Sequence, residues 1–218
     1  MKPETFTFAI MADQVASRSA EDRVPAALAA LADLPLALAF ERTAGDEIQG
    51  LASEPGHVVE VITRLTRLDG WRLGIGVGTV ETPLPDSTRA ARGGAYFAAR
   101  AAITAARRAP TGLAVAVDAA VGAGRYGELT ERARDAEGAL WLLRSVLGRR
   151  SQEGWELVDL LDQGLSNAQA AARLAVSPSA VSQRLARSAR QEGLRGAELC
   201  VRLLARLQEA PEPAGDPR

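Results

Sequence analysis

Two carboxylates in the N-terminal half of the chain are spaced so that they can meet on one divalent cation. Asp13 ends the first apolar run, and Asp46 lies in the turn Ala44-Gly45-Asp46-Glu47. A carboxylate at a strand end and another in an adjacent hairpin turn can converge, and Mg²⁺ takes one or two carboxylates together with water and phosphate oxygens. Such a site supports phosphoryl transfer by neutralising and aligning phosphate. The structural alternative is that Gly-Asp forms an ordinary hairpin turn and that Asp13 caps the next segment.

A second functional pattern lies in the C-terminal third of the chain. Gly164 ends an apolar helix, and Ser166 with Gln169 makes the Ser-x-x-Gln capping box that starts a second helix. Ser177 then caps a third helix, and Pro178 occupies its first position, where the missing N–H costs nothing. The spacing predicts two helices joined by a short turn, which is the helix-turn-helix arrangement of DNA-binding proteins.

The third of these helices carries polar side chains on its outer face. Val181 and Leu185 attach it to the core, and short polar side chains followed by Gln and Arg suit base edges and phosphates in a major groove. The expected DNA-contacting residues are Ser177, Ser179, Ser182, Gln183, Arg184 and Arg187. Arginines gather around the helix against a single acidic residue, Glu192, so the local charge is positive. They are Arg173, Arg184, Arg187, Arg190 and Arg195. A three-helix bundle used for protein contacts is the alternative.

Composition limits the classes of protein that fit these patterns. The chain has 218 residues, of which 47% are hydrophobic and 24% charged, as is ordinary for a globular protein. Its net charge of −1 provides no global positive field, so DNA binding depends on a local patch. Cys200 is the only cysteine, which excludes an intrachain disulfide and a cysteine-based zinc site, and its apolar neighbours indicate a packing role. With no signal-peptide pattern and no membrane-length apolar run, we expect a cytoplasmic protein without a membrane partner.

The elements that must position the two carboxylates alternate between strands and helices. Periodicity and turn signals predict strands over residues 5–12, 36–43, 48–51, 71–80 and 113–117, and helices over residues 19–31, 57–68 and 95–108. The order is β-α-β-β-α-β-α-β. This order predicts an α/β protein with a ferredoxin-like, or palm-like, sandwich followed by an all-α helix-turn-helix domain.

We expect four segments along the chain. Residues 1–125 form the α/β domain and residues 126–150 a helical connector. Residues 151–209 form the helix-turn-helix domain, and residues 210–218, rich in Pro, Gly and charge, form a disordered tail.

A run of alternating glycines lies within the fourth predicted strand. Gly74, Gly76 and Gly78 give Gly-x-Gly-x-Gly, which is not the dinucleotide-binding fingerprint, and no helix begins directly after it. Glycine in a strand lets a helix, another strand or a ligand approach closely. We therefore interpret this run as a close-packing surface. His57, the lone histidine, has no second His or Cys beside it and is read as a surface or capping residue.

Four segments of the first 118 residues, taken in order, resemble the SatD family of bacterial proteins, some of which carry a C-terminal helix-turn-helix. They are IMADQVASR (10–18), AGDEIQGL (44–51), RLGIGVGT (72–79) and GGAYFAAR (93–100). The resemblance covers roughly residues 5–118. More distantly, the same segments are similar to the palm core of class III nucleotide cyclases and of GGDEF-type cyclases.

The cyclase resemblance implies roles for particular residues. Asp13 and Asp46 match the Mg²⁺ ligands of a cyclase, and Arg100 matches the arginine that faces the phosphates. The wider phosphate- or nucleotide-binding set that we expect is Arg18, Gly45, Gly93, Gly94 and Arg100. Tyr96 stands where a cyclase has its transition-state Asn, and the only lysine is Lys2, so the purine-selecting Lys is also missing. These departures argue against cyclase activity and leave nucleotide binding.

The sequence thus favours a transcriptional regulator whose cyclase-like head binds a nucleotide, or another phosphorylated ligand, with Mg²⁺. One alternative is an active cyclase or nucleotidyltransferase-type enzyme that the helix-turn-helix localises. Another is a catalytically dead scaffold for dimerisation. We expect a homodimer, because one helix-turn-helix covers one half-site and because residues 197–207 offer a further apolar surface.

Overall fold

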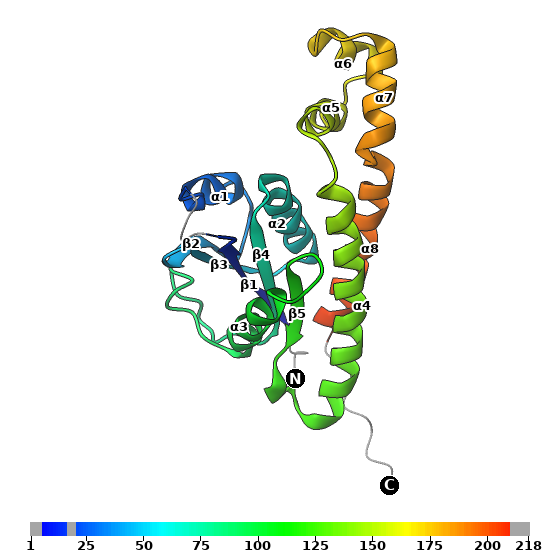
Figure 1. Ribbon diagram of the computed structural model, residues 1–218. Helices are drawn as coiled ribbons and strands as arrows, with labels where there is room; N and C mark the ends of the chain where they lie inside the picture. Colours follow the sequence, from blue (N-terminus) through cyan, green and yellow to red (C-terminus); the bar gives the residue numbers. More distant parts are fainter. Residues whose placement is uncertain (1–5, 17–20, 210–218) are drawn as a thin grey trace.

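The chain folds as a mixed α/β protein. The computed structural model describes residues 6–16 and 21–209, and the side chains of all of these except residues 123 and 124. The first eight elements are β1 (Thr7–Gln14), α1 (Val24–Leu31), β2 (Leu38–Ala44), β3 (Glu47–Ala52), α2 (Pro55–Leu68), β4 (Trp71–Gly78), α3 (Gly94–Ala106) and β5 (Leu113–Val117) (Figure 1). The predicted order of strands and helices in this part of the chain is confirmed.

One predicted element begins later than expected. Helix α1 starts at Val24 rather than at residue 19, and Pro25 occupies its first turn. The Asp22 carboxylate accepts a hydrogen bond from the backbone N–H of Val24 at 3.0 Å, which satisfies one of the free donors at the helix start. The expected cap, Ser19, lies outside the described residues.

The five strands form one mixed sheet in the order β2-β3-β1-β4-β5. Strand β1 is central and runs antiparallel to β3 and β4, β2 runs antiparallel to β3, and β5 runs parallel to β4. In this register Asp13 lies directly opposite Glu47 on one side and Arg72 on the other. Directly opposed residues project from the same face of a sheet, so these three side chains share one face.

The two faces of the sheet bury different side chains. Phe8 and Ile10 of β1 belong to the core that contains α1 and α2, whereas Ala9 and Met11 belong to the core that contains α3. Helices α1 and α2 lie on one side of the sheet and α3 on the other (Figure 1). The alternation along β1 gives Asp13 to the α3 face.

The glycine run of β4 is a surface for close helix packing, as interpreted from the sequence. A Cβ atom at Gly74 would overlap the backbone of Ile103, and one at Gly76 would overlap the backbone of Ala95 and Ala99. Helix α3 therefore lies directly on the β4 backbone, with its small residues toward the strand.

A long helix, α4 (Ala123–Leu147), covers the outer edge of β5. Three of its side chains, one or two turns apart, bond the backbone there. Glu137 accepts from the N–H of Val115 at 2.7 Å, Trp141 Nε1 donates to the carbonyl of Leu113 at 2.7 Å, and Arg144 donates to Gly112 at 3.0 Å. Arg144 also donates to the carbonyl of Trp71, and burial lowers its pKa to about 10, so the side chain stays charged at neutral pH. The helix thus closes a sheet edge that would otherwise be free to pair.

A short 3₁₀ helix, η1 (Ala119–Val121), precedes α4, and the helices that follow α4 are α5 (Gln152–Asp162), α6 (Asn167–Arg173), α7 (Pro178–Ser188) and α8 (Arg190–Gln208). Helices α5 to α7 share a small core of their own. Helix α8 returns along α4 (Figure 1), and its Cys200, Leu204 and Leu207 are buried in the core that α1, α2 and α4 share. The C-terminal helix assigned above to the tail domain therefore packs on the head.

This packing also changes the expected dimer surface. Leu204 and Leu207 are fully buried within the chain, and of the apolar residues in this stretch Leu199 is the one that is strongly exposed, at 42%. The apolar side of residues 197–207 serves the fold of the chain itself. None of the helices in the described part of the chain combines the length and apolar character needed to span a membrane.

Candidate functional site

The helices α6 and α7 are set by local caps. Ser166 accepts from the N–H of Gln169, and the Gln169 side chain accepts from the N–H of Ser166, which completes the predicted capping box. Ser177 caps α7 by accepting from the N–H of Ala180 at 3.1 Å. Ala175 takes a left-handed conformation (φ 53°) in the turn between the two helices. The predicted caps of both helices are confirmed.

Helix α7 presents most of the expected DNA-contacting residues to solvent. Val181 is buried, and Leu185 is partly buried against the same small core. The exposed residues are Ser177, Ser179, Ser182, Gln183 and Arg187. Arg184 is half-buried, and the Ser182 hydroxyl donates to the carbonyl of Pro178 at 3.1 Å within the helix. The outer face of α7 is therefore polar and open along its length.

The charge around this face is positive. Between Asp162 and Glu192 the chain contains no acidic residue and four arginines: Arg173, Arg184, Arg187 and Arg190. Arg190 points back to α5, where it donates to Asp162 at 2.6 and 2.9 Å, so it is not available to a ligand at α7. Arg173 and Arg187 are exposed. The acidic residues of this part of the chain lie on α5 instead.

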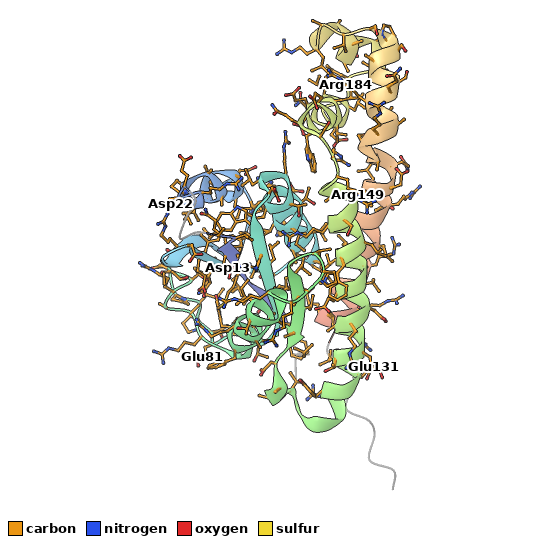
Figure 2. All side chains as sticks on the ribbon, in the orientation of Figure 1. Asp13, Asp22, Glu81, Glu131, Arg149 and Arg184 are labelled. Atoms are coloured by element: carbon orange, nitrogen blue, oxygen red, sulfur yellow. The ribbon has the colours of Figure 1, made fainter. Side chains whose placement is uncertain are left out.

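A shallow hollow of about 480 Å³ lies beside α7, at the start of α5. Arg149, Arg184 and Arg187 line it together with Glu153. Hydrogen bonds from its own N–H and from Ser151, followed by the charge of Arg184, lower the pKa of Glu153. Arg149 was not among the expected site residues. It is exposed and extends the positive surface beside α7. The tail with Arg184 is well separated from Asp13 in the head (Figure 2).

In the head, Asp13 lies at the end of β1 with only 8% of its surface exposed. Arg72 approaches one carboxylate oxygen at 3.4 Å, and Arg107, from the end of α3, approaches the other at 3.8 Å. Burial raises the pKa of Asp13, the two guanidinium groups lower it, and the charge of Asp46 raises it. Arg72 and Arg107 thus place positive charge beside Asp13, where the sequence predicted a Mg²⁺ ion.

Asp46 lies at the same end of the strands as Asp13, in the turn between β2 and β3. Gly45 adopts φ 56° in this turn, and the carbonyl of Asp46 accepts from the N–H of Gln14 at 3.3 Å. Glu47, opposite Asp13, accepts from the Thr43 hydroxyl at 2.8 Å. The structure therefore brings Asp13 and Asp46 near enough to interact electrostatically. In the described chain, no group of three or more His, Cys, Asp or Glu side chains is arranged to hold a metal ion.

Two of the three expected phosphate-binding glycines, Gly93 and Gly94, lie at the other end of the sheet, whereas Gly45 lies in the turn with Asp46. Gly93 is the N-cap of α3 and Gly94 its first residue, and both lie near the last residue of β4, Gly78, whereas Asp13 is paired with Arg72 near the first. Gly78 comes six positions after Arg72 along β4, which corresponds to about 20 Å. The carboxylate of Asp118 lies against Gly94, so an acidic side chain of the protein already occupies the N-terminal end of α3. A phosphate role for the two glycines stays a prediction.

Of the two expected phosphate-binding arginines, the one that the structure describes, Arg100, is not placed at the carboxylates. Arg100 is exposed on α3, seven residues before Arg107, which is about 10 Å along the helix axis. Its guanidinium makes no ion pair with any residue that the structure describes. Arg18 lies outside the described residues. The arginines that reach Asp13 are instead Arg72 and Arg107, whose positions in the sequence carry no signal for this contact.

Tyr96, which replaces the cyclase asparagine, belongs to a buried polar network. Its hydroxyl lies 3.2 Å from that of Thr88, and Gln49 Nε2 donates to the carbonyl of Thr88 at 2.7 Å. Burial raises the pKa of Tyr96. This network attaches the loop between β4 and α3 to strand β3. Sequence reasoning missed Thr88 and Gln49, although a Gln within an apolar strand is a signal for a buried polar contact.

The donor types at the sheet edge are compatible with Mg²⁺, which accepts two carboxylates and completes its shell with water. Asp13 and Asp46 would hold the ion, and it would supply charge neutralisation for a bound phosphate. Arg72 and Arg107 compete with such an ion for the Asp13 carboxylate.

Comparisons of the chain with protein-family models, with curated proteins and with solved structures found no match.

Proposed function

We propose that this protein is a DNA-binding transcriptional regulator in which α5, α6 and α7 form a helix-turn-helix unit. Helix α7 is the recognition helix in this proposal. Its N-terminal serines and Gln183 would meet base edges in the major groove, and Arg187 with Arg173 would contact phosphates. The unit would work as a homodimer, because a single recognition helix covers one half-site.

The observation that carries the proposal is the outer face of α7. Its polar residues are exposed although Val181 beneath them is fully buried, and 29 consecutive residues around it (163–191) lack an acidic side chain. A bundle that binds an ordinary protein surface has no need to exclude acidic residues from one face. A surface that binds DNA phosphates does need to exclude them, because an acidic side chain repels the phosphates and reduces the electrostatic attraction that drives association.

Fluorescence anisotropy tests the proposal directly. The full chain is titrated into labelled duplexes that tile the DNA upstream of its own gene, beginning at low salt. We expect at least one duplex to bind more tightly than a scrambled duplex of equal composition, and we expect the affinity to fall steeply with salt. Equal and weak binding to every duplex at low salt would refute sequence-specific regulation and would favour the protein-contact bundle.

For the head, we infer a palm-like domain that binds a nucleotide with Mg²⁺. The support is the strand order β2-β3-β1-β4 with α1 and α2 on one face, which is the order expected of a ferredoxin-like sheet, together with the pairing of Asp13 and Asp46 at one edge. A thermal-shift screen of purine nucleoside triphosphates with and without Mg²⁺ tests this, because a ligand that binds only the folded chain raises the midpoint. The variant Asp46→Asn should abolish a Mg²⁺-dependent shift, whereas Asp86→Asn on an exposed loop should not.

The scaffold alternative is favoured by two contacts. Tyr96 is used in the buried network with Thr88, and Asp118 covers the start of α3, so neither position is free for catalysis or for phosphate. The enzyme alternative predicts nucleotide turnover. Chromatography of a nucleoside triphosphate after incubation with the protein and Mg²⁺ distinguishes the enzyme alternative from the scaffold alternative. An unchanged nucleotide together with no thermal shift would support the scaffold.

A further inference from the structure

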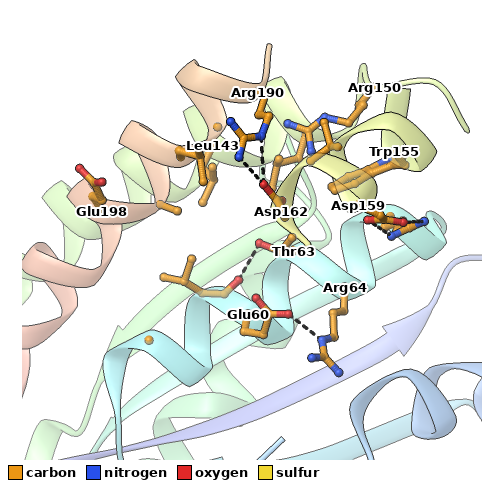
Figure 3. Close-up of a pocket in the computed structure, with 18 of the residues that line it drawn as sticks. Glu60, Thr63, Arg64, Leu143, Arg150, Trp155, Asp159, Asp162, Arg190 and Glu198 are labelled. Atoms are coloured by element: carbon orange, nitrogen blue, oxygen red, sulfur yellow. Dashed lines mark hydrogen bonds and ion pairs between the residues drawn. The ribbon is translucent and has the colours of Figure 1, made fainter. Parts of the chain in front are cut away.

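A large open groove lies between the head and the helix-turn-helix unit. It has a volume of about 990 Å³, which is at the upper end of the range for small-molecule sites. Helix α2 forms one wall, α8 forms another, and α5 closes one end (Figure 3). The site is distinct from the sheet edge with Asp13 and from the outer face of α7.

Apolar side chains form most of the exposed surface inside the groove. Val59 of α2, Leu143 and Leu147 of α4, Val158 of α5 and Val201 of α8 contribute side chains to it. The lining follows α8 over the nine residues from Gly193 to Val201, which corresponds to about 12 Å along the helix axis. The shape therefore suits an elongated apolar body rather than a compact polar one.

Most charged groups of the groove neutralise one another. Asp159 binds Arg67 at 2.7 and 2.9 Å, Asp162 binds Arg190 at 2.6 and 2.9 Å, and Glu60 binds Arg64 at 2.7 Å (Figure 3). Each carboxylate named here is thus matched by a guanidinium group.

Arg150 differs from these arginines. It is only 9% exposed, and within the described chain no carboxylate lies within ion-pair distance of it. Its Nε donates to the carbonyl of Ser188 at 2.8 Å, and its guanidinium lies 4.2 Å from the ring centroid of Trp155. Burial lowers the pKa of Arg150, although the more distant Asp162 and Asp159 act against this. A buried cation without a counterion is costly, and an anion in the groove would remove much of that cost.

We propose that the groove binds an elongated small molecule with an apolar body and one anionic headgroup. The headgroup, a carboxylate, sulfonate or phosphate, pairs with Arg150 beside the face of Trp155, and the body lies between α2 and α8. Such a ligand contacts the head through Val59 and the helix-turn-helix unit through Trp155 and Val158. Its effect on DNA binding rests on the function proposed above, but its binding does not.

Two fluorescent probes of nearly the same shape test the proposal. Anilinonaphthalene sulfonate carries an anionic group, and phenylnaphthylamine is its uncharged analogue. We expect saturable binding of the sulfonate to the wild-type chain. Arg150→Gln should weaken it by about tenfold or more while affinity for the uncharged probe changes little. The matched control is Arg149→Gln, which removes the same charge from the adjacent, exposed position and should leave both probes bound.

A second variant and a competition keep the test decisive if Arg150→Gln fails to fold. Ala197→Phe adds bulk to the α8 wall without removing a buried side chain, and it should exclude both probes while circular dichroism remains unchanged. With the wild-type chain, decanoate should displace the sulfonate, and decanol should do so much less well. Non-saturable sulfonate binding, equal displacement by decanol, or full binding to a folded Ala197→Phe variant would each overturn the proposal.

The regulatory consequence is measured separately. Anisotropy titrations of DNA are repeated with and without decanoate, with Ala197→Phe as the control that cannot bind it. Failure of DNA binding in both conditions would count against the proposed regulator, whereas probe binding without DNA binding would leave the ligand site standing alone.

Discussion

Arg67 of α2 donates one hydrogen bond from each terminal nitrogen to Asp159 of α5, at 2.9 and 2.7 Å, and so joins the α/β head directly to the small bundle of α5, α6 and α7. The guanidinium of Arg67 lies 5.2 Å from the ring centroid of Trp155, and that of Arg150 lies 4.2 Å from the same centroid. This cluster forms the closed end of the groove described above (Figure 3). These charged and aromatic side chains add to the apolar packing of α8 on the head in holding the two parts together.

We expect Arg67→Ala and Asp159→Ala to change global stability little and the mobility of the tail more. The two side chains are 42% and 40% exposed, so their pair contributes about 1 kcal/mol or less to the free energy of unfolding. Amide hydrogen exchange should nevertheless become faster in α5 in both variants. The matched control is Arg89→Ala, which breaks a looser pair with Glu41 within the head. Unchanged exchange in α5 would contradict the proposed role of the Arg67–Asp159 pair.

The DNA proposal predicts the effect of two substitutions on α7. Gln183→Ala and Arg187→Ala should each weaken binding to the specific duplex by about 1–3 kcal/mol, because each removes a contact to base or backbone. Neither residue is buried, so thermal stability should not change. Gln191→Ala and Arg108→Ala remove the same side-chain types from exposed positions elsewhere and should bind normally. Normal affinity of both α7 variants would exclude α7 as the recognition helix.

The surroundings of Gly76 in β4 and Gly138 in α4 predict opposite effects for their substitution by Ala. Gly76→Ala places a methyl group against the backbone of Ala95 and Ala99, so we expect a loss of several kcal/mol in the free energy of unfolding, on the order of other severe overpacking changes. Gly138→Ala lies in α4 with open space around it and should stabilise by about 0.5–1 kcal/mol. Urea unfolding of both variants measures the difference. Equal stability would show that α3 can move away from β4.

The burial of Asp13 predicts a pH-dependent gain from Asp13→Asn. The folded chain raises the pKa of this carboxyl above its ordinary value of 3.8, so the folded state holds the proton more tightly than the unfolded state. Ionised Asp13 therefore costs stability at neutral pH, and the cost disappears as the pH falls below its ordinary value. We expect the variant to be more stable than wild type at pH 7 and the difference to shrink in acid. Urea unfolding along a pH series measures this. A less stable variant at pH 7 would show that the ion pairs with Arg72 and Arg107 outweigh burial.

The homodimer remains a prediction that solution mass can test. Light scattering should give twice the chain mass of 22.9 kDa at micromolar concentration. Phe97 on α3 is 76% exposed, and we expect Phe97→Asp to lower the dimer fraction. Leu142 on α4 is 71% exposed on a different element, and Leu142→Asp serves as the control. A monomer for the wild-type chain, with and without DNA, would contradict the proposal.

Much of the local structure could be predicted because its causes lie within a few residues. The caps at Ser166 and Ser177 depend on side chains and backbone groups three positions apart, and both formed as expected. The strand and helix order follows from periodicity in the same way. The glycines of β4 indicated a close approach, although their spacing did not identify α3 as the partner.

Only the tertiary structure decided which charged groups meet. Asp13 contacts Arg72 and Arg107, which lie 59 and 94 residues away in the sequence, and Asp118 occupies the start of α3. Helix α8 packs on α4 and α2, which creates the groove where Arg150 lies without a partner carboxylate among the described residues. Residue types along the chain determine which helices and strands form. The ion pairs and the groove depend instead on the relative placement of those elements, which is set by the joint burial of many distant side chains.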